Sequence, residues 1–361
     1  GDTWEVTVPS FRVDIYGKQD LIEEIVRIYG YDNLKSVLPE VSTTKLKKWP
    51  FRDLKRQIDQ YLVNNGAYET LNYSFHRKED NRFFGDGERD LQLKNPLGLD
   101  YSIMRNSLIP GILKNIATNF NQSSQSAFFF ETGSVFSLNP DLKPDFNHDL
   151  SAISQRKMLA VGASGIFRKS NWRMKESIEW DLYLFKSVLV NLFKSLFIDI
   201  DLVSTTVQYL SKDSAFEIQS NGISLGFIGQ LEPSTTAVYR VEKPVFIAEI
   251  DLENCLSIQK EFKLQMWPKF PSTKRDFSFF MDNSGTYASI RETIDQIKPN
   301  RLVSYELFDR YEGKGNPEGK ISLSMSFTYQ DPARTLENNE VNEIHEKFIT
   351  ELIEKRHLVQ R

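Results

Sequence analysis

The chain of 361 residues contains one cysteine, Cys255. A single cysteine excludes an internal disulfide, a CxxC redox pair and a cysteine-based zinc site, and it fits a reducing, cytoplasmic compartment. The four histidines, at positions 76, 148, 345 and 357, show neither metal-ligand spacing nor a paired carboxylate. We therefore expect each of them to be a surface or structural histidine.

The common motifs of nucleotide and acyl chemistry are missing as well. The sequence has no GxxxxGK[ST], no GxGxxG after a strand and no GxSxG. The most apolar segment, residues 182–197, is interrupted by Lys186 and Lys194, so it does not predict a membrane span. Gly226 and Gly229 indicate a tight turn at a strand rather than a phosphate cradle. We predict no catalytic residue in this chain.

An excess of positive charge is also absent. The chain has 45 Lys and Arg against 49 Asp and Glu, a formal net charge of −4. This balance lacks the global basic signature of a nucleic-acid binder, so any contact with RNA must come from a local patch. What the chain has in quantity is apolar residues, 40% in all with 26 Phe and 14 Tyr, enough to build the cores of two or three domains.

The most informative stretch lies between Trp4 and Tyr31 and reads WEVTVPSFRVDIYGKQDLIEEIVRIYGY. Its first part alternates like a strand. Asp20 and Glu23 then have the spacing of a helix capping box, and Gly30 ends the helix. Capping explains those two carboxylates but not Asp14 or Glu24. Four hard oxygen donors within eleven residues also suit Mg²⁺ or Ca²⁺, and spacing alone leaves the two interpretations open.

The middle of the chain predicts a mixed pattern of helices and short strands. We expect helices at 51–62 and 107–120, and another after Asp181 as N-cap. Residues 127–138 resemble a hairpin that turns at Gly133, and Phe128–Phe130 are expected in the core. Short strands follow, with an Asn221-Gly222 hairpin turn. Strands adjacent in sequence predict an antiparallel sheet with flanking helices, hence the α+β class.

The last part, from about residue 268, has the element order βαββαβ of a ferredoxin-like domain. Its 14 basic and 15 acidic residues give it no net positive charge. Six basic residues nevertheless suggest a local patch for phosphates: Lys274, Arg275, Arg310, Lys314, Lys320 and Arg334. The alternative is an ordinary solvated surface. Tyr311 and Phe308 are candidates for stacking on a base or for core packing.

Three blocks of sequence resemble one family in the family's own order. They are VPSFRVDI with DLIEEIVRIYGYDNL, then NPLGLDYSIMRNSLIPGILKNIATNFNQ with FFFETGSVF and GFIGQLEPSTTAVYR, and finally KFPSTKRDFSFFMD with LFDRYEGKGNPEGKISLSMSFTYQDPARTL. The chain thereby resembles the C-terminal part of the beta subunit of bacterial phenylalanyl-tRNA synthetase (phenylalanine–tRNA ligase). The family's editing domains precede this region.

The resemblance implies three domains. Residues 1–45 are the truncated second half of a helix-and-strand domain, in which Asp14, Asp20, Glu23 and Glu24 hold Mg²⁺ near the alpha subunit. Residues 46–265 are a catalytically inactive module with the fold of class II synthetases. Residues 268–361 are a ferredoxin-like anticodon-binding domain, whose last helix we expect Asn338 to cap because Glu337 stands at the family's usual cap position.

The inactivity of the middle module is visible in the residues. Active class II enzymes carry an fRxE motif, whose arginine binds the ATP α-phosphate. At the comparable place this chain has Glu131 but no arginine before it, and the glycine-rich motif that ends in arginine is missing too. The resemblance therefore implies a subunit that is silent alone and that supports ATP-dependent charging of phenylalanine tRNA in an α2β2 assembly, with ATP bound by the alpha subunit. The alternatives are a stand-alone ligase and an RNA-binding module outside any synthetase.

Overall fold

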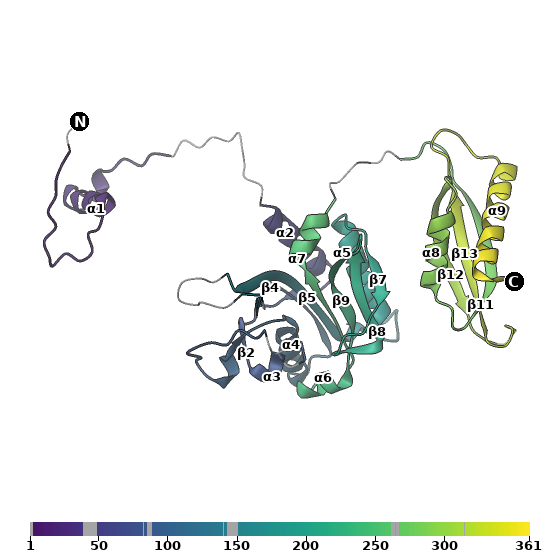
Figure 1. Cartoon of the computed structure of the whole chain (residues 1–361), viewed down its shortest axis with the longest axis horizontal. Helices are drawn as coiled ribbons and strands as arrows, with labels where there is room; N and C mark the ends of the chain where they lie inside the picture. Colours follow the sequence, from purple (N-terminus) through teal and green to yellow (C-terminus); the bar gives the residue numbers. More distant parts are fainter. Residues whose placement is uncertain are drawn as a thin grey trace. The chain divides into compact units, whose positions relative to one another are not determined.

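The computed structural model describes residues 3–38, 49–81, 83–84, 89–139, 141–142, 151–260, 264, 267–313 and 315–361. Lys314, His148 and most of the expected linker after residue 38 lie outside this range. The chain divides into two compact units, residues 1–261 and 262–361 (Figure 1). The expected boundary near residue 266 lies close to this division, while the expected boundary at residue 45 stays a prediction.

Residues 3–38 contain one α-helix, α1 (Lys18–Tyr29), and the 3-10 turn η1 (Tyr31–Asn33). The predicted strand before α1 is wrong, because residues 3–17 form no strand. A strand needs a neighbour to satisfy its backbone groups, and no described segment pairs with this one. The predicted start of α1 is also wrong. Gly17 is its N-cap and Asp20 lies at the third helical position, whereas Gly30 ends the helix as expected.

An eight-stranded sheet forms the centre of the first unit, with β6 beside β5 and the order β1-β4-β5-β10-β9-β8-β7. All pairs are antiparallel except β1 with β4. The strands are β1 (Tyr68–Glu69), β4 (Ser126–Leu138), β5 (Ile153–Arg168), β6 (Ile178–Glu179), β7 (Asp201–Ser204), β8 (Leu210–Ser220), β9 (Ile223–Leu231) and β10 (Val245–Asp251). The expected α+β class is confirmed.

Helices cover both faces of this sheet. Helices α2 (Pro50–Asn64), α5 (Leu182–Ser195) and α7 (Leu252–Ile258) share one core with Phe128 and Phe130. Helix α4 (Ile109–Asn121) shares the other core with Phe129. Helix α6 (Pro233–Val238) follows the end of β9. The alternation of the three phenylalanines follows from the two-residue period of a strand. A smaller layer near α4 contains β2 (Phe75–His76), α3 (Lys78–Asn81), η2 (Leu99–Tyr101) and β3 (Ile103–Met104).

The second unit confirms the predicted ferredoxin-like order. Its antiparallel sheet has the strand order β12-β13-β11-β14, and both helices contact the same apolar face. The elements are β11 (Thr273–Asp282), α8 (Tyr287–Ile297), β12 (Leu302–Tyr311), β13 (Lys320–Tyr329), α9 (Asn338–Arg356) and β14 (Val359–Gln360). The predicted Asn338 cap is wrong. Glu337 occupies the N-cap of α9 without a side-chain cap bond, so the helix begins one residue earlier than expected.

Two glycine predictions in the middle of the chain are also wrong. Strand β4 continues through Gly133, which pairs with Met158 of β5, so no hairpin turns there. A Cβ at Gly133 would lie 2.3 Å from Nη2 of Arg105, so this glycine makes room for an arginine. Gly226 likewise lies inside β9, with φ 140° and no space for a Cβ beside the carbonyl oxygen of Glu249.

Other local predictions are confirmed. The Asp181 side chain caps α5 by accepting a hydrogen bond from the Leu184 N–H. Asn221 and Gly222 both have positive φ, as the predicted hairpin turn requires. Among the described residues, no helix is both long and apolar enough to cross a membrane.

Candidate functional site

The four predicted metal ligands lie on and just before α1. Asp14 precedes the helix, Glu23 is exposed, and Glu24 is half-buried one residue further on. Asp20 accepts hydrogen bonds from the backbone N–H groups of Tyr16 and Gly17 at 2.8 and 2.9 Å, both through Oδ2. These bonds lower the pKa of Asp20. Asp20 therefore caps the backbone N–H groups of Tyr16 and Gly17, which precede the helix, from its own position in the first turn of α1.

Arg12 joins two of the other carboxylates. Its Nη2 lies 2.7 Å from Oδ2 of Asp14 and 2.8 Å from Oε1 of Glu24, and Arg27 binds the second oxygen of Glu24. The hydrogen bonds from Arg12 lower the pKa of Asp14 and of Glu24 to about 2. Both carboxylates are consequently ionised at neutral pH. The guanidinium of Arg12 already balances their negative charge.

As these side chains lie, they do not fit Mg²⁺. The guanidinium of Arg12 occupies the space between Asp14 and Glu24, and the described residues contain no group of three or more His, Cys, Asp and Glu that could hold a metal ion. Sequence analysis overlooked Arg12. Its signal was present, because a basic residue two positions before Asp14 can reach that carboxylate.

Strand β4 carries the residues that the sequence analysis compared with an fRxE motif. In an fRxE motif the arginine stands two residues before the glutamate, which is Phe129 here. The Glu131 carboxylate is buried and ion-paired with Arg105 at 2.6 Å, and its second oxygen accepts a hydrogen bond from the Asn72 amide at 2.6 Å. Both oxygens of Glu131 are thus used inside the protein.

The face of the sheet around Phe129 is filled by α4. A Cβ at Gly162, the partner of Phe129 on β5, would lie 2.4 Å from Cγ2 of Ile112 on α4. The start of α4 is held by the partly buried Glu249 of β10. Its carboxylate accepts hydrogen bonds from the Leu108 N–H at 2.6 Å and from the Ser107 hydroxyl at 3.0 Å. Burial raises the pKa of Glu249 to about 7. Helix α4 therefore packs against this face of the sheet, and the Arg105–Glu131 ion pair is buried beside it.

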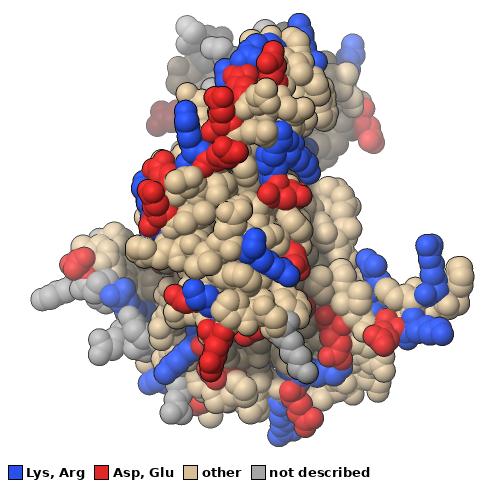
Figure 2. Space-filling view, turned by 90° about the vertical axis from the view of Figure 1, so that its right-hand side faces the viewer, with Lys and Arg blue, Asp and Glu red and all other residues tan. Residues whose placement is uncertain are grey.

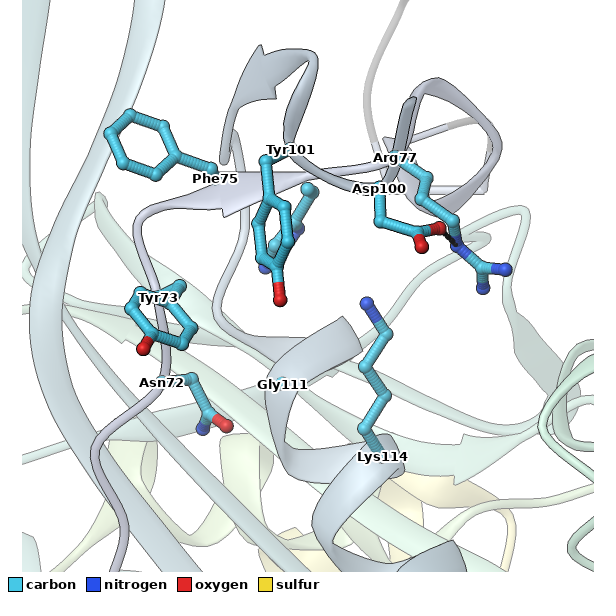
Figure 3. A pocket seen from close by; sticks show the side chains of 9 residues that line it. Asn72, Tyr73, Phe75, Arg77, Asp100, Tyr101, Gly111 and Lys114 are labelled. Atoms are coloured by element: carbon cyan, nitrogen blue, oxygen red, sulfur yellow. Dashed lines mark ion pairs between the residues drawn. The ribbon is translucent and has the colours of Figure 1, made fainter. Parts of the chain in front are cut away.

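A separate cavity of about 320 Å³ opens between β2, η2 and α4. Figure 3 shows Tyr73, Tyr101 and Lys114 around the same space, with Gly111 of α4 at its edge. The two tyrosine rings meet edge to face with centroids 5.7 Å apart. Sequence analysis missed this cavity, because its two aromatic walls come from segments almost thirty residues apart.

The charges near the cavity are paired around Asp80. This buried carboxylate binds Lys114 at 2.6 Å and Arg77 at 3.1 Å, and it accepts a hydrogen bond from the Tyr239 hydroxyl at 3.3 Å. Arg77 also lies 3.8 Å from Asp100. The buried His76 lines the cavity, and burial lowers its pKa to about 4. The rim of the cavity is therefore close to neutral.

The predicted phosphate-binding residues of the last domain fall into two groups. Lys274 pairs with Thr328 across β11 and β13, whereas Lys320 lies at the other end of the same strand pair, opposite Asp282. Eight residues of strand at ~3.3 Å each separate these ends by ~26 Å. Arg275 binds Asn338 and Asn342 near the first end, and Arg310 pairs with Leu323 near the second.

Most of these cations have an acidic neighbour. Lys274 lies 3.6 Å from Glu306, Arg310 2.9 Å from Glu312, and Arg334 2.7 Å from Glu340. The weakest pair, Lys320 with Asp282, measures 4.0 Å. Acidic and basic side chains alternate over the face drawn in Figure 2. The described members of the predicted patch therefore do not merge into one basic surface, and phosphate binding by these residues stays a prediction.

Comparison with known families finds three matches along the chain. Residues 34–252 match the family described as "Phenylalanyl tRNA synthetase beta chain CLM domain". Residues 268–361 match "Ferredoxin-fold anticodon binding domain", and residues 1–31 match "tRNA synthetase B5 domain". The three matches follow one another in the same order as the three blocks of the sequence analysis.

Curated relatives match over nearly the whole chain. A phenylalanine–tRNA ligase beta subunit of Bacillus licheniformis is 31% identical over 365 residues, which cover 99% of this chain and 44% of the relative. The corresponding subunit of Bacillus subtilis is 31% identical, with 97% and 43% covered. The chain thus spans less than half the length of these relatives.

Among solved structures, a pyrrolysyl-tRNA synthetase of Desulfitobacterium hafniense aligns with 58% of this chain and 68% of its own. The TM-score is 0.43 and the identity 12%, values too low to support a conclusion about this chain.

Proposed function

Because the chain belongs to the family of phenylalanyl-tRNA synthetase beta subunits, we propose that it is the non-catalytic C-terminal part of such a subunit. The complete ligase would join phenylalanine to its tRNA through an adenylate, with ATP bound by the alpha subunit. This part would contribute contact with the alpha subunit in an α2β2 assembly and contact with the anticodon stem of the tRNA.

The observation that carries this proposal is that Phe129 is packed in the core and that Glu131 is ion-paired inside the protein. An adenylating enzyme needs a cation where charge develops on the α-phosphate, because preorganised positive charge stabilises that transition state. Phe129 is an apolar residue packed under α4, and the only charge that Glu131 contacts is that of Arg105 among the described residues. Neither position offers a cation to a substrate. The module is therefore suited to association rather than to chemistry.

The fold and family of the last domain support the proposed contact with the anticodon stem. This domain has the ferredoxin-like fold, and its family is described as anticodon-binding. Binding would be salt-dependent if Lys274, Arg275, Arg310, Lys320 or Arg334 reached phosphates, because each contact releases counterions. Since four of these five described cations already have an acidic neighbour, we expect this contact to be weak in isolation.

A structural Mg²⁺ at Asp14, Asp20, Glu23 and Glu24 is part of the proposal only for the assembled enzyme. Four carboxylates so close in sequence are a suitable donor set for this ion. Arg12 would first have to release Asp14 and Glu24. In the arrangement described above, Arg12 supplies the positive charge instead.

Co-purification tests the proposal. The tagged chain is coexpressed with the alpha subunit of the same organism and washed at high salt, which removes ionic contacts. We expect the alpha subunit to be retained in a fixed molar ratio. Absence of the alpha subunit after this wash, together with retention of RNA in a parallel wash at low salt, would favour an RNA-binding module outside a synthetase and would overturn the proposal.

A further inference from the structure

The segment that connects β5 to β6, residues 168–177, is strongly basic, and we call it the β5–β6 loop. It contains Arg168, Lys169, Arg173 and Lys175 against a single carboxylate, Glu176. All four basic side chains are exposed, and none of them forms an ion pair with a carboxylate among the described residues. The loop therefore presents an excess of positive charge in a chain whose formal net charge is −4.

The basic residues of the last domain are in a different state. Four of the five described members of the patch predicted there have an acidic neighbour, so their charges largely cancel. Charges of one sign that gather in one place add to a positive potential, which attracts a polyanion and raises its rate of association. On electrostatic grounds the β5–β6 loop is the better target for a chain of phosphates.

A tryptophan lies between the two pairs of cations in this loop. Trp172 is 92% exposed and directly precedes Arg173. Proteins gain stability by burying a ring of this size, which removes ~150–250 Å² from water. An exposed ring beside exposed cations is the combination that binds single-stranded nucleic acid, because the ring stacks on an unpaired base while the cations contact the backbone.

Hydrogen bonds within the loop fix the turn that carries this ring. The Oδ1 atom of Asn171 accepts hydrogen bonds from the backbone N–H groups of Arg173 and Met174 at 3.0 and 2.9 Å. The Asn171 N–H in turn donates to the carbonyl of Met174 at 2.7 Å. Trp172 lies inside this closed turn. A preformed turn loses less conformational entropy when a ligand binds, which favours affinity.

The base of the loop is anchored in the core of the first unit. Arg168 pairs with Ile178 where β5 meets β6. Two residues further on, Trp180 is buried, with its ring centroid 4.7 Å from that of Phe128 and 4.8 Å from that of Phe167. The loop thus projects from packed strands, and a site on rigid elements holds its side chains more precisely than a site on a free segment.

The composition of the loop favours RNA over a membrane or an acidic protein. Membrane-binding segments insert a face of several apolar side chains, and protein interfaces have an apolar centre. Trp172 is the one large apolar side chain that residues 168–177, all of them described, leave exposed. One ring among four cations instead matches a ligand that alternates planar bases with phosphates.

We propose that the β5–β6 loop binds RNA, with its four cations on phosphates and Trp172 stacked on an unpaired base. The identity of this RNA as phenylalanine tRNA rests on the proposed function. The synthetase-like module then makes a tRNA contact of its own, carried by residues far in sequence from the anticodon-binding domain.

The first test measures binding of this chain to fluorescently labelled phenylalanine tRNA by anisotropy, at salt concentrations between ~50 and ~200 mM. We expect Arg173→Gln with Lys175→Gln to raise the dissociation constant at least about fivefold and to flatten its salt dependence by ~0.7–0.9 for each lost phosphate contact. Lys194→Gln with Lys212→Gln is the matched control. Both lysines are exposed in the same unit and lie outside the loop, and the change in net charge is the same.

The second test concerns the ring. Trp172→Ala should raise the dissociation constant about tenfold, the effect of losing one stacked base. The salt dependence should not change, because stacking releases no counterion. Trp172→Phe is the control and should keep most of the affinity, since its ring still stacks. Thermal melting curves should be those of the parent for both variants, because Trp172 is 92% exposed.

Three results would overturn the proposal. The first is parent affinity with the parent salt dependence in the Arg173 and Lys175 variant, and the second is an equal loss of affinity in the Lys194 and Lys212 control. The third is parent affinity in Trp172→Ala together with competition by poly-L-glutamate, a polyanion without bases, which would assign the loop to an acidic protein surface. Co-purification of the alpha subunit after a high-salt wash does not depend on this loop. A failure here would therefore leave the proposed function standing.

Discussion

Arg105 and Glu131 form an ion pair that is buried inside the first unit, with Nη1 and Oε1 2.6 Å apart. Arg105 reaches β4 from the loop before α4 and also donates to the carbonyl of Ser134 at 2.8 Å. The pair ties the loop before α4 to strand β4. Its strength and the pH dependence of the neighbouring Glu249 can both be measured.

Loss of one partner of this pair should destabilise the protein strongly. Glu131→Gln leaves the guanidinium of Arg105 buried without its counter-charge, which typically costs about 3–5 kcal/mol. Urea denaturation should show this loss in the free energy of unfolding. Asp199→Asn is the control, because its pair with Lys260 is exposed and such pairs contribute ~0–1 kcal/mol. Equal effects of the two substitutions would mean that the buried pair does not hold the module together.

Glu249 should make the first unit less stable as the pH rises. Burial raises its pKa to about 7 from 4.5, despite Arg105 and Arg156 nearby. The folded protein then binds more protons than the unfolded chain between these values, so stability is full below pH 4.5 and falls until the pH has passed about 7. The loss is on the order of 3 kcal/mol.

Glu249→Gln should remove this slope, because an amide oxygen still accepts the hydrogen bonds from Leu108 and Ser107 without titrating. The measurement is the melting temperature of parent and variant between pH 5 and pH 8, with the difference between them as the readout. The contributions of His76 and His345 to the pH dependence are the same in both proteins and cancel in that difference. A constant difference across this range would show that Glu249 titrates normally.

Element order and some local features of this fold could be predicted from sequence, whereas contacts between residues far apart in the chain could not. Asp181 caps α5 and Asn221-Gly222 turns a hairpin because each depends on neighbours within a few residues. Gly133 resembled a turn because glycine usually marks one. Its actual reason is Arg105, whose side chain arrives from 28 residues upstream and cannot be seen in a local pattern.

The candidate site shows the same limit. The four carboxylates beside α1 were visible, but their arrangement depends on Arg12, which competes with a metal ion for two of them. The identity of the basic residues in the last domain was visible too. Their separation into two groups depends on the register of β11 against β13, which sequence does not give.

Magnesium should stabilise the reassembled enzyme if the four carboxylates bind it there. Titration of Mg²⁺ is expected to raise the melting temperature of the complex of alpha with complete beta subunits, and chelation should reverse the gain. Asp20→Asn combined with Glu24→Gln should abolish most of it. The readout is the gain on adding Mg²⁺, because both substitutions also disturb contacts that exist without metal. An undiminished gain in the double variant would contradict the assignment.

Charge reversal in the last domain should weaken binding of phenylalanine tRNA by the complete enzyme. Arg310→Glu with Arg334→Glu removes two cations of the predicted patch, so affinity should fall and its salt dependence should flatten by ~1 for each lost phosphate contact. Lys347→Glu with Lys355→Glu on α9 makes the same change in net charge and is the control. An unchanged salt slope in the Arg310 and Arg334 variant would place the phosphate contacts elsewhere.

The central claim, that this chain acts by association and has no adenylating activity of its own, is tested most directly by ATP–pyrophosphate exchange with phenylalanine. The purified chain alone is compared with a mock purification and with the complex of alpha and complete beta subunits. We predict phenylalanine-dependent exchange by the complex only, because Phe129 and the Arg105–Glu131 pair leave no cation for the α-phosphate. Exchange by the chain alone, above the mock purification, would contradict the account and would identify a stand-alone ligase.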